Sequence, residues 1–276
     1  MATHSIRPAA VAGSFYPADA RVLRTQISEL LAATLTPPTL PAPKAIVVPH
    51  AGYMYSGAIA ASAYACLPPL RQTVRRVVLL GPAHRMGFQG FALPAAQGFG
   101  SPLGQVSLSR PDWLRLQERD DVFVDDRPHA QEHSLEVQLP FLQSVLDHFE
   151  LVPVLVGQAS VDAVAALLET LWGGDETLIV LSSDLSHYHP YAFARDFDRR
   201  TVDQILHYGH ALNHQQACGA TPLNGLLLAA QRHDLQPHLL DLRNSGDTAG
   251  DRNSVVGYAS IAFCPSSEER PRHALH

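Results

Sequence analysis

The chain is poor in cysteine, in basic charge and in long apolar runs, and each of these shortages excludes a class of protein. Its 276 residues include only three cysteines, too few and too widely spaced for a disulfide framework. With 20 Lys and Arg against 26 Asp and Glu, the net charge of −6 provides no basic field for nucleic acid or a membrane surface. No uncharged apolar run is long enough to span a membrane, and the N-terminus lacks a signal-peptide core. We therefore predict a cytoplasmic protein.

In other respects the composition is that of a globular domain, with an unusual number of histidines. Hydrophobic residues make up 46% and charged residues 17% of the chain, which is typical of a folded domain. The length suits one large α/β domain, and we expect a single domain over residues 1–276, with its core at 7–263 and a polar tail at 265–276. Fifteen histidines indicate metal binding or acid/base chemistry.

Short apolar runs alternate with segments of helical spacing along most of the chain. This alternation predicts an α/β fold with a central mixed, partly parallel sheet flanked by helices. The expected strands lie within the runs 45–49, 75–85, 150–157, 176–187, 238–244 and 254–263, and irregular strands with hairpin-type turns are expected at 91–109. The expected helices are at 19–35, 57–67, 110–119, 131–148 with a kink or break at Pro140, 160–172, 190–208 and 222–232, and a proline-rich connector is expected at 35–43.

Histidine and aspartate follow several of these expected strands. His50 follows the first strand, His84 the second, and Asp184 and His187 follow the strand that ends near residue 182. A lone histidine at such a position is more often a surface or core residue than a ligand. In open α/β sheets, however, ligands bind outside the carboxyl ends of the strands, so the recurrence predicts a shared site there.

The stretch "EHSLE" adds Glu132, His133 and Glu136 at an expected helix start. A histidine at a helix N-terminus stays neutral more easily, which suits a metal ligand or a hydrogen-bond donor. For Glu136 two interpretations stay open, a contact to substrate or a solvated acid that complements the helix dipole. Tyr53 and Tyr55, after the first strand, either present hydroxyls to a ligand or pack as an aromatic pair.

Cys218 precedes an expected helix start at "GATP", where a lowered thiol pKa would favour thiolate chemistry or metal ligation. The alternative is a small buried side chain, the usual fate of a free cysteine. Cys66 and Cys264 lie in apolar runs, and we expect both to be packing residues.

Seven stretches in fixed order resemble the Memo family, which includes the bacterial and archaeal AmmeMemoRadiSam system protein B. These stretches, between about Arg7 and Phe263, are "RPAAVAGSFYP", "VVPHAGYMYSG", "LLGPAHR", "EHSLEVQLPFLQ", "VPVLVG", "SSDLSHYH" and "CGATPLNGLLLA". The resemblance implies the fold of the class III extradiol dioxygenases. It also implies a metal site of His50, His84 and Cys218, with Asp184 and His187 adjacent and His133 lining the pocket.

A metal-dependent oxidoreductase is the function that this resemblance implies. Two histidines and a thiolate suit iron(II) first, then copper, and they also bind zinc. We expect His133, Asp184 and His187 to act in catalysis, Tyr53, Tyr55 and Glu136 to contact a small phenolic or related substrate, and dioxygen to be a second substrate. Two alternatives stay open: a binding module for a peptide or small ligand, and a zinc-dependent hydrolase. The oligomeric state is not predicted.

Overall fold

Four parallel strands form the centre of the molecule. The computed structural model describes residues 5–34 and 40–266. In their order across the sheet, the central strands are β2 (Ala45–Val48), β9 (Thr177–Ser182), β3 (Arg76–Pro82) and β8 (Glu150–Val156). Each pairs in parallel with its neighbour. Parallel sheets are covered on both faces, which explains why these segments read as continuous apolar runs.

Alternate residues of the central strands enter two separate cores. Val77 and Leu79 of β3 lie in one core, whereas Val78 and Leu80 lie in the other. This division follows from the two-residue period of a strand, which points successive side chains to opposite faces. A fully apolar strand therefore stabilises helices on both sides of the sheet.

Antiparallel strands complete both edges of the sheet. β12 (Val255–Pro265) pairs with β2 and also with β11 (Leu235–Asn244) and β10 (His187–His189). At the other edge, β4 (Phe91–Leu93) pairs antiparallel with β8 and parallel with β7 (Val122–Val124). A separate three-stranded sheet contains β1 (Ile6–Arg7), β5 (Gly98–Ser101) and β6 (Gly104–Ser107).

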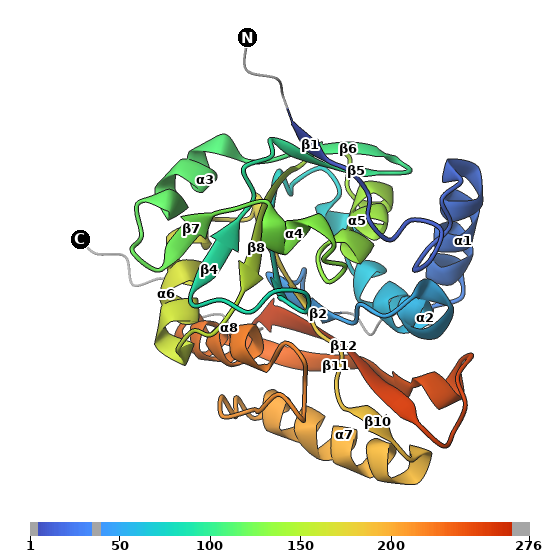
Figure 1. Ribbon diagram of the computed structural model, residues 1–276. Coiled ribbons are helices and arrows are strands. Elements are labelled where there is room, and N and C mark those ends of the chain that lie inside the picture. The colour runs from blue at the N-terminus through green and yellow to red at the C-terminus, as the bar shows by residue number, and fades with distance from the viewer. Residues whose placement is uncertain (1–4, 35–39, 267–276) are drawn as a thin grey trace.

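Helices cover both faces of the large sheet (Figure 1). One face is covered by α1 (Ala20–Ala32), α2 (Tyr53–Tyr64) and α5 (Leu139–Val145), and the other by α6 (Val161–Leu171), α7 (Tyr191–Leu206) and α8 (Ala220–Arg232). The remaining helices are α3 (Arg110–Gln117) and α4 (Arg127–Ala130), with short 3₁₀ turns at Pro68–Leu70, Glu136–Gln138 and Ser245–Asp247.

The predicted fold class, a single α/β domain with a central mixed sheet, is confirmed. Side-chain N-caps stand at the starts of two helices. Asp19 accepts hydrogen bonds from the N–H groups of Arg21 and Val22 at the start of α1. Ser160 accepts one from the N–H group of Ala163 at the start of α6. The segment expected at 131–148 is not one continuous helix, and the break expected at Pro140 is found: a 3₁₀ turn at Glu136–Gln138 precedes α5, which begins at Leu139. Pro140 lies in the first turn of the short α5, a position where proline is tolerated, so the helix begins there. Residues 35–39 of the expected connector and 267–276 of the expected tail lie outside the described residues.

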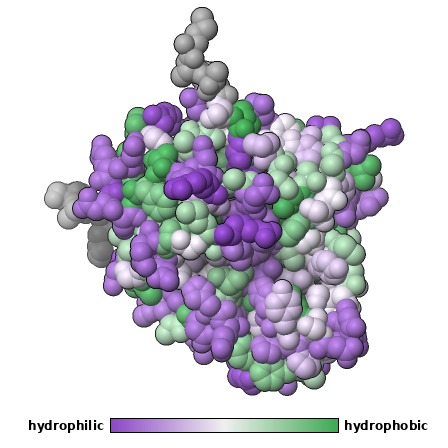
Figure 2. Space-filling view, in the orientation of Figure 1, coloured by the Kyte–Doolittle hydropathy of each residue, from purple (hydrophilic) through white to green (hydrophobic). Residues whose placement is uncertain are grey.

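Polar and apolar residues are mixed over the visible surface, as Figure 2 shows. Large exposed apolar side chains are scattered over several elements, namely Val22, Met54, Leu114, Tyr188 and Phe193. Single residues of this kind are normal on a protein surface. Among the described residues, no helix has both the length and the apolar character that crossing a membrane requires.

Candidate metal centre

The carboxyl edge of the parallel strands brings the predicted residues together. His50 lies two residues beyond β2, His84 two beyond β3, and Asp184 two beyond β9. The register aligns these ends, because Val48 of β2 pairs with Ser182 of β9. Strand-end residues that are distant in sequence therefore lie side by side.

Three imidazoles form the centre of this site. One nitrogen each of His50, His84 and His133 lies within 4.8 Å of the others. The ring centroids of His50 and His84 are 5.0 Å apart with the planes at 78°, and those of His50 and His133 are 5.4 Å apart at 88°. The rings of His84 and His133 stack, with centroids 4.7 Å apart and an interplanar angle of 22°.

His50 is the deepest of the three histidines. Its side chain is 2% exposed, against 28% for His84 and 15% for His133, so the cluster opens toward solvent on the side of His84 and His133. Burial, followed by the effect of His84, lowers the pKa of His50 to about 3. His50 is therefore neutral at pH 7, which is the state that binds metals.

Glu132 binds two of the histidines at once. Its Oε1 lies 2.9 Å from Nδ1 of His84, and its Oε2 accepts a hydrogen bond of 2.6 Å from the backbone N–H of His84. Oε1 also accepts from the N–H groups of His133 and Ser134. Burial alone would raise the pKa of Glu132, but these hydrogen bonds outweigh burial and lower it below its ordinary range. An ionised carboxylate thus orients His84.

His133 has an unsatisfied ring nitrogen. Its Nδ1 is buried and lies 3.3 Å from Oε1 of Glu132, but the two atoms form no hydrogen bond. Burial, followed by the effect of His50, lowers the pKa of His133 to about 4. Phe15 packs against its other side, with ring centroids 4.8 Å apart. A buried nitrogen without a partner is rare in native proteins and indicates a group reserved for a ligand or a proton.

Cys218 and Asp184 complete the inner side of the cluster. Sγ of Cys218 lies 3.2 Å from Nε2 of His50, and Oδ2 of Asp184 lies 3.9 Å from the same nitrogen. Oδ1 of Asp184 accepts a 2.7 Å hydrogen bond from the N–H of His50. Burial raises the pKa of Asp184.

The expectation of a lowered thiol pKa at Cys218 is wrong for the metal-free protein. Burial and then the charge of Asp184 raise the pKa of the thiol well above its ordinary value. The backbone N–H groups of Asp184 and Gly219 lower this pKa, but they do not offset burial and the charge of Asp184. An added Cβ on Gly219 would lie 2.7 Å from Cβ of Ser183, so only glycine allows this close approach of α8 to the β9 loop.

His187 and Tyr55 lie at the margin of the cluster. The ring of His187 contributes to the pKa shifts of both His50 and Asp184, and its Nδ1 lies 2.9 Å from the carbonyl of Leu185. Tyr55 is partly exposed. The pKa of Tyr258 is raised by burial, then by Asp184 and then by Tyr55. His187 stays a predicted catalytic residue, and Tyr55 stays a predicted substrate contact.

Tyr53 and Glu136 lie in the core and not at the cluster. The hydroxyl of Tyr53 donates to the carbonyl of Val137 at 2.7 Å, and its ring packs against Phe141. Glu136 is fully buried and forms a 2.6 Å ion pair with Arg7. Its carboxylate also accepts from the N–H groups of Ala10 and Val11 and from the hydroxyl of Tyr16. Since these partners occupy both side chains, we no longer count either residue among the proposed substrate contacts.

Sequence reasoning assigned no role to several residues that support the cluster. Besides Glu132 and Phe15, these are Ser182 and Gln138, which form a buried hydrogen-bond chain behind His50. Only Glu132 had a visible signal, since it directly precedes His133 in "EHS". Gly81 of β3 allows Ser134 and Leu135 to pack closely against the strand. An added Cβ on Gly81 would lie 2.8 Å from Cδ2 of Leu135 and 2.9 Å from Oγ of Ser134.

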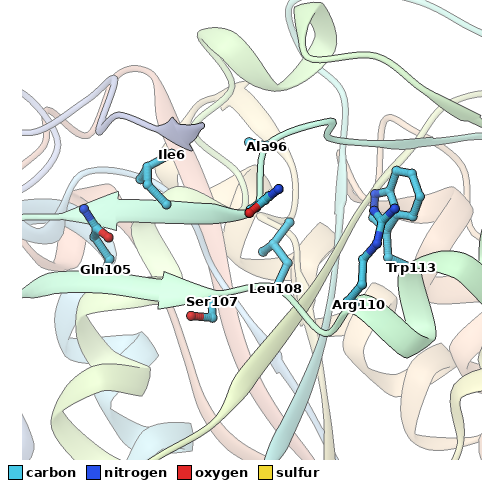
Figure 3. Close-up of a pocket in the computed structure, with 8 residues that line it drawn as sticks. Ile6, Ala96, Gln105, Ser107, Leu108, Arg110 and Trp113 are labelled. Carbon is cyan, nitrogen blue, oxygen red and sulfur yellow. The ribbon is translucent and has the colours of Figure 1, made fainter. Parts of the chain in front are cut away.

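Away from the histidine cluster, a pocket of about 530 Å³ lies between the small sheet and α3 (Figure 3). Arg110 and Trp113 lie at one end of it, and the guanidinium carbon of Arg110 is 3.9 Å from the Trp113 ring centroid. None of its described lining residues has an imidazole, thiol or carboxylate, so this pocket offers no metal ligands. The full lining is Ile6, Ala96, Gln97, Gln105, Ser107, Leu108, Arg110 and Trp113.

Comparison with known proteins gives consistent matches over nearly the whole chain. The family model described as "Memo-like protein" matches residues 7–262. A "MEMO1 family protein" of Sulfolobus acidocaldarius is 36% identical, over 94% of this chain and 99% of that protein. One from Methanopyrus kandleri is 34% identical over 93% and 98%. The crystal structure of uncharacterized protein JW3007 from Escherichia coli K12 covers 80% of this chain and 98% of its own, with a TM-score of 0.50 and 13% identity, which indicates a shared fold alone.

Proposed function

Because the chain belongs to the Memo-like protein family, we propose that it is a metal-dependent oxidoreductase whose centre is the strand-end histidine cluster. His50 and His84 would hold the metal through Nε2, with Cys218 as a third ligand. The proposed metal is iron(II), with copper as the next choice. The proposed substrates are a small phenolic or related molecule and dioxygen.

One observation carries this proposal: nitrogens of three histidines lie within 4.8 Å at the carboxyl edge of the sheet. The donor set also fits a metal chemically. Nδ1 of His50 has Ser182 as its partner and Nδ1 of His84 has Glu132, so in both rings Nε2 is the nitrogen left for a metal. Histidine ligands in metalloproteins commonly have such a partner on their other nitrogen.

His133 is better suited to proton transfer than to ligation beside His84. An imidazole binds a metal in the plane of its ring, and the rings of His84 and His133 stack with an interplanar angle of 22°. With a pKa near 4, His133 is neutral at pH 7 and able to accept a proton from a bound substrate. Asp184, whose Oδ2 lies 3.9 Å from Nε2 of His50, would complete or orient the site.

The exposed side and the buried side of the cluster would have different roles. The exposed side, over His84 and His133, is where a substrate would enter, and Phe15 and Tyr55 would contact it there. The buried side, around His50, excludes water. When bound, iron or copper would supply one-electron and dioxygen chemistry that amino-acid side chains do not provide.

Zinc-dependent hydrolysis is the second candidate function, and the three-histidine set is the observation that favours it. Catalytic zinc sites use three protein ligands, in some enzymes three histidines, and leave one position for water. The identity of the metal distinguishes the two functions, because zinc has no redox chemistry.

The test is metal analysis of protein purified without oxygen, followed by oxygen-uptake assays with catechols and other phenols. We expect about one iron per chain and oxygen uptake with at least one phenol. The key variant is His50→Asn, whose amide is able to keep the hydrogen bond to Ser182 but cannot replace Nε2. Its matched control is His207→Asn, a change at an exposed histidine next to α7.

Folded His50→Asn protein should lose most of its metal while His207→Asn keeps it. Stoichiometric zinc without oxygen uptake would favour the hydrolase. Absence of any metal from the wild type, even after incubation with iron(II), copper(I) or zinc, would contradict both functions and leave a metal-free binding module.

A further inference from the structure

We infer that Ser182 and Gln138 are positioning residues that fix which ring nitrogen of His50 bears the hydrogen, so that Nε2 offers its lone pair before any metal binds. The effect on metal binding rests on the proposed function. The tautomer itself does not, since it follows from hydrogen bonds within the protein.

The first step is the hydroxyl of Ser182. Its Oγ lies 2.6 Å from the backbone carbonyl of Ser134, and a carbonyl only accepts. A serine hydroxyl has a single hydrogen, so that hydrogen points to Ser134. Toward every other neighbour, the Ser182 oxygen must therefore act as an acceptor.

The second step is the amide of Gln138. Its Nε2 donates to the carbonyl of Pro49 and to Oγ of Ser182, each at 2.9 Å. Its Oε1 accepts a 2.9 Å hydrogen bond from the hydroxyl of Tyr64. The opposite amide orientation would place two oxygens face to face at Pro49, so the network allows one assignment only. Gln138 thus occupies one of the two lone pairs of Ser182.

The third step is His50 itself. Its Nδ1 lies 2.9 Å from the remaining lone pair of Ser182, so Nδ1 must be the nitrogen that donates. Nε2 then has no hydrogen and faces Sγ of Cys218 at 3.2 Å. The single thiol hydrogen of Cys218 has two acceptors in reach, this nitrogen and the carbonyl of Asp184 at 3.6 Å.

Burial makes this arrangement selective. Ser182 and Tyr64 are fully buried, and Gln138 and His50 are 1% and 2% exposed. Water therefore cannot replace a missing partner, and the other tautomer would leave a buried hydroxyl and a buried imidazole with opposed lone pairs. Loss of such an outer partner typically weakens metal binding about 10- to 100-fold.

The test is ¹⁵N NMR of histidine-labelled protein at pH 7.5 after removal of metal by a chelator, with the His50 signals assigned by their loss in His50→Ala. We expect Nδ1 of His50 to show the shift of a protonated ring nitrogen and Nε2 that of an unprotonated one. In Ser182→Ala the Nδ1–H form should lose its dominance, and Co²⁺ affinity should fall about 10- to 100-fold. Ser182→Thr, which keeps the hydroxyl, should retain both properties.

The matched control is Ser260→Ala, which removes another fully buried serine hydroxyl, one that donates to the carbonyl of Ile59. It should leave the His50 tautomer and the Co²⁺ affinity unchanged. A wild-type His50 with its hydrogen on Nε2 would overturn the inference even if Ser182→Ala does not fold. So would an unchanged tautomer in folded Ser182→Ala. If the wild type binds neither Co²⁺ nor iron(II), copper(I) or zinc, the proposed function fails, and the spectra alone decide the tautomer.

Discussion

The three imidazoles of the cluster differ chemically because each has a different partner. Nδ1 of His50 contacts a neutral hydroxyl, that of His84 contacts a carboxylate, and that of His133 has no hydrogen bond. A carboxylate partner makes an imidazole a stronger ligand than a neutral partner does. The individual residues are therefore not interchangeable, and variants at each should give different results.

Glu132→Gln tests the carboxylate that orients His84. Glutamine keeps the volume but has one acceptor oxygen in place of two, so either the backbone or the ring of His84 loses its partner. We expect Co²⁺ affinity to fall about 10- to 100-fold and the free energy of unfolding to fall by about 1–3 kcal/mol. Metal titration and denaturant unfolding measure the two effects. Glu118→Gln, at an exposed site, is the control, and equal affinity in both variants would contradict this role.

His133→Ala should separate ligation from proton transfer. If His133 accepts a proton from the substrate, the variant keeps its metal but loses about 100-fold or more in turnover. The measurements are metal content and steady-state rates on whichever phenol supports oxygen uptake. A loss of metal as complete as in His50→Asn would instead make His133 a ligand.

Cys218 should make metal binding depend on pH. Since its pKa is raised in the metal-free protein, a metal that binds Sγ must displace a proton at neutral pH. The logarithm of the Co²⁺ affinity should then rise by about one for each pH unit between pH 6.5 and 8. Cys218→Ala should bind more weakly and lack this slope. An equal slope in both proteins would show that the thiol is not a ligand.

At the level of elements, residues 127–145 are held by tertiary contacts. This segment consists of α4, a 3₁₀ turn and α5, which have 4, 3 and 7 residues. Helices this short are not stable on their own. Arg7 of β1 supplies much of the support, since it bonds Glu136 and donates to the carbonyls of His129 and Glu132 at 2.6 Å each.

Arg7→Ala should therefore destabilise the protein and loosen the cluster from a distance. Removing one partner of a buried ion pair leaves an uncompensated charge and costs about 3–5 kcal/mol. Arg71→Ala is the matched control, because the Arg71–Asp147 pair has the same 2.6 Å separation but lies at the surface. We expect this control to lose no more than about 1 kcal/mol. Denaturant unfolding measures both, and equal losses would contradict a structural role for the buried pair.

Across the whole molecule, buried neutral histidines should govern stability in mild acid. Burial lowers the pKa of His50 to about 3 and those of His129 and His133 to about 4. In the unfolded chain histidine titrates near pH 6.5. Between these values the unfolded state binds more protons, so the free energy of unfolding falls as the pH drops from about 6.5 toward 4.

The expected slope for the metal-free protein approaches about 4 kcal/mol per pH unit, the sum for three protons. His129→Gln should reduce it by about 1.4 kcal/mol per pH unit, since glutamine does not titrate but is able to keep the contact that Nε2 makes with the carbonyl of Ala92. Denaturant unfolding at a series of pH values measures the slope. A slope unchanged by His129→Gln would show that His129 does not contribute.

The sequence by itself determined the central strands, the main helices between them and the position of His50, His84 and Asp184 at strand ends. Those signals are local: apolar runs, caps such as Asp19, and prolines. Only the tertiary structure decided which side chains are already engaged in hydrogen bonds or ion pairs with other residues. Glu136 pairs with Arg7, 129 residues away, and His50 with Ser182, 132 residues away. Burial and partners brought by other strands set the pKa of Cys218 and the tautomer of His50, because both depend on groups that no local pattern places nearby.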